Sequence, residues 1–237
     1  MFIYNDYIAY NQLVTILYNK YTMDKLVVIH IGKCGGSTVT TELKKHNIPF
    51  EKVHVSKAIY DPTKRYVIVT RNPTKQFVSA FNWRLHILTH QKSRMREFDM
   101  EKKLLLYYGN VNKLAMDLYD NTGALNQTLH RSIEKTTSHL HKRNHFYLDT
   151  FFQDCPKEHI RGVICTETIS DDMKRIFNIH ITSHAKNNQM RNYSTYLSNV
   201  ARANLKEYLK KDYLCLEYLI RIGCIQKNIT KTMQLLQ

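Results

Sequence analysis

The stretch LVVIHIGKCGGST, residues 26–38, decides the fold of this chain. Its first part, residues 26–31, is an almost uninterrupted apolar run with the length of a buried β-strand. Three of the 7 glycines in the chain follow within five residues. After the glycines, the spacing of the apolar residues becomes helical and predicts a helix over about 37–46. The order strand, glycine-rich turn and helix is typical of a unit in an α/β fold.

The rest of the chain continues this alternation. Further strands are predicted over residues 50–55, 66–70 and 161–166, and helices over 73–88, 169–177 and, as one helix or two, 194–222. Residues 97–140 are polar with helical spacing and predict two or three surface helices. Apolar strands separated by helices predict a central, mostly parallel sheet with helices on both faces. Because there is no repeat or flexible linker, we expect one domain over residues 23–237, preceded by an N-terminal extension over 1–22.

The composition excludes several classes of protein. Of the 237 residues, 43% are hydrophobic and 23% are charged, which is ordinary globular usage and argues against disorder. The longest apolar run is far shorter than the roughly 20 residues of a membrane span. The N-terminus lacks the pattern of a signal peptide, which favours a cytoplasmic protein without fixing the compartment. The 5 cysteines form no CxxC pair, which favours free thiols over a disulfide framework or a zinc ribbon.

The net charge is strongly positive. Lys and Arg number 35 against 20 Asp and Glu, a formal charge of +15. Such a surface attracts polyanions, among them nucleic acids, acidic polysaccharides and phosphorylated cofactors.

The glycine-rich turn has the composition of an anion-binding loop. It reads Gly32-Lys33-Cys34-Gly35-Gly36-Ser37-Thr38. Backbone N–H groups at a helix N-terminus bind phosphate, and glycine lets the backbone approach it closely. Lys33 adds a positive charge, and the hydroxyls of Ser37 and Thr38 add donors. The loop matches neither GxxxxGK[ST] nor GxGxxG, because its lysine precedes the glycine pair. A tight turn that needs positive φ is the structural alternative.

This loop resembles the 5′-phosphosulfate loop of sulfotransferases that use 3′-phosphoadenosine 5′-phosphosulfate (PAPS). A second segment, the strand over 66–70 followed by RNPTKQFVSAF, resembles that family's strand and RxPxxRxxSxY/F motif. The resemblance implies that Gly32–Thr38 bind the 5′-phosphosulfate, and that Arg71 and Ser79 bind the 3′-phosphate of the donor.

Two positions of the second segment depart from the family pattern. Gln76 stands where the family often has Arg, and Asn72 stands where it often has Asp. We expect these differences to alter packing rather than binding.

A histidine lies between the two motifs, in the segment KVHVS over residues 52–56. It resembles the strand of uronosyl 2-O-sulfotransferases that carries a catalytic histidine as G-H-x-S/A, although Lys52 and Val53 replace residues common there. The resemblance implies that His54 is the base that takes the proton of the acceptor hydroxyl, as a neutral imidazole can. It also implies that Lys33 stabilises charge on the bridging oxygen. Strand alternation places Val53 and Val55 on the face opposite His54. An ordinary strand histidine is the alternative.

Four later segments resemble the same family in the same order, so that the resemblance covers roughly residues 25–220. They are 139–149, 163–177, 184–193 (the loop that closes over the nucleotide) and 205–218. The resemblance implies a P-loop-like sulfotransferase topology and sulfuryl transfer to an acceptor hydroxyl, preferably on an anionic glycan. The second product would be adenosine 3′,5′-bisphosphate, and no metal would be needed.

Other interpretations stay open. His139, His141 and His145 could bind a metal, but no cysteine or carboxylate pair lies nearby in the sequence, which favours a solvated or acceptor-contacting segment. Six basic residues are either solvated or part of a positive cleft for a glycan: Arg84, Lys92, Arg94, Arg96, Lys142 and Arg143.

The alternative functions are a non-catalytic protein that binds polyanions or nucleic acid, and an ATP-dependent phosphotransferase. No nucleic-acid-binding motif is present, and the nucleotide triphosphatase motif is missing.

Overall fold

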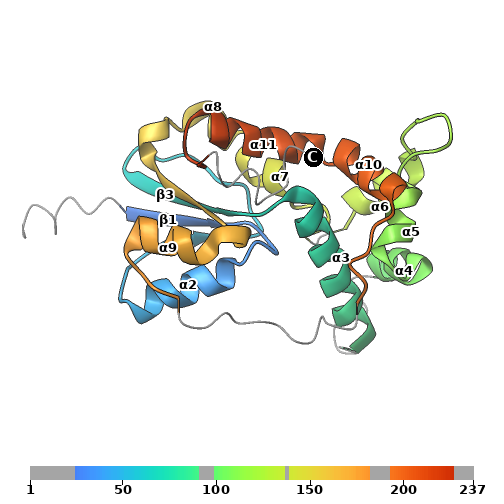
Figure 1. The fold of residues 1–237 in the computed structure, drawn as a ribbon, viewed down its shortest axis with the longest axis horizontal. Helices are drawn as coiled ribbons and strands as arrows, with labels where there is room; N and C mark the ends of the chain where they lie inside the picture. The colour runs from blue at the N-terminus through green and yellow to red at the C-terminus, as the bar shows by residue number, and fades with distance from the viewer. Residues whose placement is uncertain (1–24, 91–98, 137–138, 182–192, 227–237) are drawn as a thin grey trace, which may run out of the picture.

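The computed structural model describes residues 25–90, 99–136, 139–181 and 193–226 (Figure 1). The expected extension over 1–22 lies outside these residues, as do Lys92, Arg94, Arg96 and most of the expected closing loop over 184–193. Among the described helices, none has both the length and the apolar composition to cross a membrane.

A parallel four-stranded sheet forms the centre of the described structure. Its strands lie in the order β2 (Glu51–Val53), β1 (Lys25–His30), β3 (Lys64–Thr70) and β4 (Ile160–Cys165). Every neighbouring pair is parallel. Helices α2 (Gly36–Lys45) and α9 (Ile169–Phe177) cover one face, and α7 (Asn144–Leu148), α8 (Phe151–Asp154) and α11 (Lys210–Arg221) cover the other (Figure 1). The predicted α/β class, single domain and parallel sheet are therefore confirmed for this part of the chain.

The middle strands are buried because their side chains have neighbours on both faces. The apolar residues of β1 and β3 belong to one core with α2, α7 and α11. Such continuous apolar runs are characteristic of parallel strands between two helical layers. This explains why the strands over 26–31 and 66–70 could be found from the sequence.

A second core lies beside the sheet and consists mainly of helical residues, with none from the strands. It joins α3 (Pro73–His90) to α4 (Asp99–Tyr108), α5 (Val111–Met116), α6 (Gln127–Glu134) and α10 (Asn199–Tyr208). The prediction of two or three helices over 97–140 is confirmed, and the segment 194–222 forms two helices. Four short elements were not predicted: α7, α8, and the 3-10 turns η2 (Lys157–His159) and η3 (Thr166–Thr168).

A buried ion pair joins the start of α7 to α11. Arg143 Nε donates to Asp212 Oδ2 at 3.0 Å, and the backbone N–H of His145 donates to Asp212 Oδ1 at 2.9 Å. The Asp212 side chain is only 1% exposed. Burial alone would raise the pKa of Asp212, but the Arg143 charge and the His145 hydrogen bonds hold it below its ordinary value.

We expect Asp212→Ala to destabilise the fold strongly, because it leaves Arg143 charged and buried without a partner. The expected loss is about 3–5 kcal/mol of unfolding free energy, measured by urea denaturation. The double variant Arg143→Met/Asp212→Leu removes both charges and should recover much of that loss. If the double variant is as unstable as Asp212→Ala, the unpaired charge is not the cause.

Candidate functional site

The carboxyl ends of the strands open into a pocket of about 660 Å³. Open parallel sheets commonly bind ligands at this edge. The pocket is lined by His30, Lys33, Gly35, Gly36, Ser37, Thr38, His54, Arg71, Ser79, Trp83, His139 and Thr166. Most of the predicted site residues are therefore together. Gly32 and Cys34 of the predicted loop do not line the pocket, and both are buried.

Each strand delivers residues to this pocket. His30 ends β1 and the glycine loop follows it, His54 follows β2, Arg71 follows β3, and Thr166 follows β4. The strands are parallel and in close register, with His30 opposite Val69 and Thr70 opposite Cys165. Residues that are far apart in sequence therefore meet at one edge of the sheet.

The glycines of the loop have two different structural roles. Gly35 has φ +77° and is the N-cap of α2, a left-handed conformation that glycine adopts without strain. Gly32 and Gly36 allow close packing, because a Cβ at Gly32 would lie 2.0 Å from His139 Nδ1 and one at Gly36 would lie 2.1 Å from the His30 ring. Gly35 is therefore required by the positive φ of the turn. Gly32 and Gly36 are required because the rings of His139 and His30 pack directly against the backbone there.

Helix α2 begins without a side-chain cap. The first N–H groups of any helix have no partner within the helix. In α2 the N–H of Thr38 already donates to the Gly35 carbonyl at 3.0 Å, which leaves Gly36 and Ser37 as the first two residues of the helix, and both line the pocket. The N–H groups of Gly36 and Ser37 can therefore receive an anion, the role predicted for this loop.

Two cations lie at the same end of the pocket. Arg71 Nη1 donates to the Lys33 carbonyl at 3.4 Å, and Arg71 Nε forms an ion pair with Glu167 Oε1 at 3.9 Å. Burial, and then the nearby Arg71 charge, lower the pKa of Lys33 to about 8. Ser79 lies on α3 and faces the same pocket.

Three histidine rings lie next to one another in the pocket, the first two stacked and the third tilted. The ring centroids of His30 and His54 lie 4.3 Å apart, and those of His54 and His139 lie 5.3 Å apart. Burial, and then the neighbouring His54, lower the pKa of His30 to about 4 and that of His139 to about 3. Both rings are consequently neutral at neutral pH.

The hydrogen bond of His54 fixes its proton position. His54 Nδ1 lies 2.8 Å from the carbonyl oxygen of His30. A carbonyl only accepts, so Nδ1 carries a hydrogen, and in the neutral imidazole the lone pair is therefore on Nε2. This is the form of imidazole that can take a proton from a substrate.

The predicted strand around His54 was too long. Strand β2 ends at Val53, and Val55 is 46% exposed with φ +60°. The N–H of Val55 donates to the Tyr147 hydroxyl at 3.1 Å, and Lys142 Nζ donates to its carbonyl at 2.7 Å. These bonds replace sheet pairing, so strand alternation does not set the direction of His54. Its bond to His30 does.

Gln76 and Asn72 have packing roles. Gln76 is buried, and its Nε2 donates to the Gly32 carbonyl at 2.9 Å, which joins α3 to the loop. Asn72 Oδ1 accepts the N–H of Lys75 at 3.0 Å, as a helix N-cap does. Both side chains therefore contribute to the packing of α3 in this structure.

The other histidines of the predicted cluster have different partners. His141 pairs with Glu134 and His145 with Asp212, whereas His139 lies in the pocket. The described residues contain no group of three or more His, Cys, Asp or Glu that could hold a metal ion. All five cysteines are free.

Three of the six basic residues considered for a glycan cleft are described, and each has a structural contact. Arg84 donates two hydrogen bonds to the carboxylate of Glu101, whose side chain is 3% exposed. Arg143 is buried against Asp212, and Lys142 bonds the Val55 carbonyl. The described part of this set therefore does not form a cleft of solvated cations.

Four residues at the site were missed by the sequence reasoning: His30, Trp83, Thr166 and Glu167. Trp83 follows Ser79 by one helical turn, so the i, i+4 rule could have placed it on the same face of α3. His30 and Thr166 end or follow strands, a position that could have indicated them. Glu167 lies in the segment 163–177 that resembles the family, but its role was not predicted, because that role depends on contact with Arg71.

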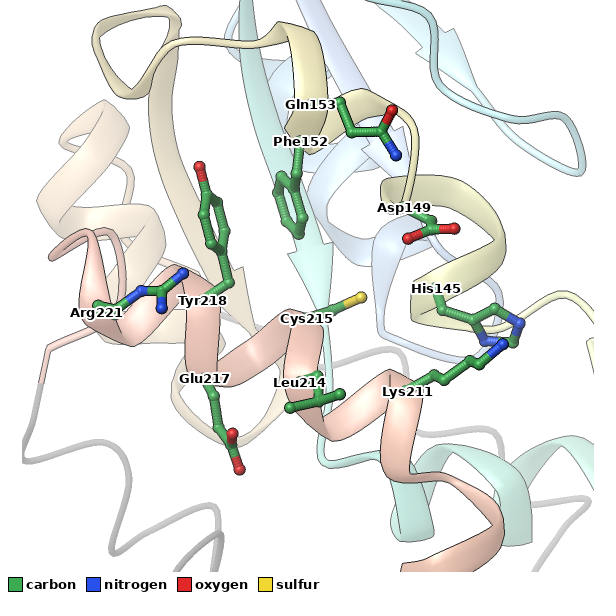
Figure 2. Close-up of a pocket in the computed structure, with 10 residues that line it drawn as sticks. All are labelled: His145, Asp149, Phe152, Gln153, Lys211, Leu214, Cys215, Glu217, Tyr218 and Arg221. Atoms are coloured by element: carbon green, nitrogen blue, oxygen red, sulfur yellow. The ribbon is translucent and has the colours of Figure 1, made fainter.

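A second pocket has a volume of about 670 Å³ and shares no lining residue with the first. Figure 2 shows the residues that line it. It is bounded by α7, α8 and α11, and the rings of Phe152 and Tyr218 lie 4.6 Å apart in it. Its charges are mixed, with Asp149 and Glu217 beside Lys211 and Arg221. This lining favours no single charge of ligand, in contrast to the cationic pocket at the sheet edge.

Comparison with known proteins gives no independent indication of function, because no family model, curated protein or solved structure matches the chain.

Proposed function

We propose that the chain is a PAPS-dependent sulfotransferase that transfers a sulfuryl group to an acceptor hydroxyl, preferably of a carbohydrate. The observation that carries the proposal is the meeting of three elements in one pocket. The glycine loop, the Arg71–Ser79 motif and His54 come from different strand ends and face the same 660 Å³ space. The strand order, with the loop directly after central strand β1, supports the sulfotransferase type of topology.

The residues present fit the donor. The uncapped start of α2 and the ammonium of Lys33 suit the 5′-phosphosulfate. Arg71 and Ser79 would bind the 3′-phosphate, and Arg71 Nε is buried without a hydrogen-bond partner among the described residues. Bound PAPS would supply the sulfuryl group, and adenosine 3′,5′-bisphosphate would be the second product.

His54 is the proposed general base. Its Nδ1–H is held by the His30 carbonyl, so Nε2 is free to take the proton of the acceptor hydroxyl. Lys33 would stabilise the negative charge that develops on the bridging oxygen of the donor. His30 and His139 stay uncharged and leave these two groups as the proton acceptor and the electrostatic stabiliser.

We expect adenosine 3′,5′-bisphosphate to raise the melting temperature of the protein. A ligand that binds only the native state stabilises it by mass action. ATP should raise it much less, because Arg71 and Ser79 would have no 3′-phosphate to bind. Differential scanning fluorimetry compares the two. Equal increases in melting temperature would favour an ATP-dependent phosphotransferase. No increase with either nucleotide would show that PAPS is not the donor.

We expect His54→Ala to lower turnover of labelled PAPS by roughly 10²–10⁴-fold. The variant should still bind adenosine 3′,5′-bisphosphate, because the phosphate-binding residues remain. The matched control is His46→Ala, a histidine exposed at the end of α2, which should keep its turnover. Acceptors are supplied as a panel of glycans and phenols. If His54→Ala stays active, the base is another group, and His139, which lines the same pocket, is the next candidate.

A non-catalytic polyanion-binding function is the second candidate, and a separate groove favours it. Lys75, Arg202 and Lys206 line a groove of about 470 Å³ between the starts of α3 and α10. Among the residues described, no carboxylate lines it. Arg202 and Lys206 are four residues apart on one helix face, so two positive charges lie side by side along the groove.

Salt dependence of binding tests this alternative. Changing Lys75, Arg202 and Lys206 to Gln should reduce the slope of log K against log salt for single-stranded DNA by about 2. The control changes Arg131, Lys135 and Lys174 to Gln, an equal loss of charge at exposed positions on other helices. Equal slopes in the two triple variants would show that the groove is not a polyanion site.

A further inference from the structure

The only tryptophan of the chain contacts the lysine of the phosphate-type loop. Lys33 Nζ lies 4.3 Å from the centroid of the Trp83 ring. An ammonium over an indole face is attracted by the ring quadrupole, and indole is the strongest of the aromatic partners. Both residues line the candidate site. The contact is thus between the proposed charge stabiliser and a second residue that lines the same pocket.

The surroundings of Lys33 otherwise disfavour its charge. Arg71, at the end of β3, is a second cation beside it. The other titratable groups that face it are the buried Cys34 thiol, which favours the ammonium weakly, and His139, which is neutral. Within the described part of the chain, no carboxylate forms an ion pair with Lys33, and Glu167 is instead paired with Arg71.

The backbone also holds Lys33 in place. Its φ is +65°, in the left-handed region that few residues other than glycine occupy. Arg71 and Gln76 bond the carbonyls of Lys33 and Gly32, which fixes this turn against α3. With the backbone fixed, the contact of the side chain with Trp83 decides where the ammonium lies.

We propose that Trp83 is a positioning residue that holds the Lys33 ammonium in the empty pocket until an oxyanion enters. A bond between an ammonium and a phosphate or sulfate oxygen is stronger than a cation–π contact. The ammonium therefore leaves the ring when the anion binds. The ring keeps the Lys33 side chain protonated and inside the pocket. When the anion binds, the ammonium moves from the ring to an oxygen of the anion. The identity of that anion rests on the proposed function, but the Lys33–Trp83 contact does not.

Tryptophan fluorescence tests the contact without any ligand. Emission of the native protein, excited where tyrosine does not absorb, should change with a midpoint near pH 8, where Lys33 loses its proton. Lys33→Met keeps the length of the side chain, and it should abolish this transition. His86→Gln is the control, because His86 also stacks near Trp83 at 6.2 Å, and it should leave the transition in place. A transition that persists in Lys33→Met would overturn the proposal.

A second measurement tests whether the ring stabilises the charge. The pH dependence of Lys33 acylation, read by mass spectrometry, reports the protonation of its amine. Trp83→Leu should move the midpoint down by about half a pH unit, since the charged form loses the ring. Trp83→Phe keeps a weaker aromatic face and should move it less. An unchanged midpoint in Trp83→Leu would show that the indole has no role beyond packing.

A third measurement separates this inference from the donor assignment. Pyrophosphate, as a simple oxyanion probe, and adenosine 3′,5′-bisphosphate are each added during the fluorescence titration. Release of Lys33 from the ring should remove the transition near pH 8 with either probe. If only pyrophosphate acts, the positioning role holds and the donor is not PAPS. If both bind and leave the transition intact, Lys33 does not move to the anion and the proposal fails.

Discussion

The close register of four parallel strands is the constraint on which the candidate site depends. Since the strands end at one edge, each places its following residues beside those of its neighbours. The glycine loop comes from β1, His54 from β2, Arg71 from β3 and Glu167 from β4. A shift of one strand by one residue would turn its side chains to the other face of the sheet. The buried middle strands oppose such a shift, because their apolar side chains fill the core on both sides.

Close packing of imidazole rings against the loop is the second constraint. His139 fills the space where Gly32 would have a Cβ, and His30 does the same at Gly36. The rings are thereby desolvated, which lowers the pKa of each well below its ordinary value. The pocket thus combines cations at one end with neutral histidines beside His54. Trp83 and Glu167 complete this arrangement, since one contacts the Lys33 ammonium and the other pairs with Arg71.

Two arginines outside the pocket have a structural role instead of lining a ligand site. Arg84 and Arg143 are paired with the buried carboxylates of Glu101 and Asp212 and contribute to the packing of helices. Residues of the same type are thus structural in one place and exposed to a pocket in another. Sequence counts of Lys and Arg give the net charge, but they do not separate these roles, because the separation depends on whether a carboxylate lies within a few ångströms.

The sequence by itself determined the strand–glycine loop–helix unit, the parallel α/β class and most of the lining of the site. An apolar run and a glycine cluster are local patterns that predict the first strand, the loop and the helix, whereas Arg71, Ser79 and His54 were predicted from the resemblance to a family motif. The end of β2 was missed because Tyr147 and Lys142, some 90 positions away, bond the backbone of Val55. Only the tertiary structure placed His139 against Gly32, Trp83 against Lys33 and Glu167 behind Arg71. Each of these contacts joins segments that the chain separates widely, and their distances arise only when the sheet and the two helical cores have packed together.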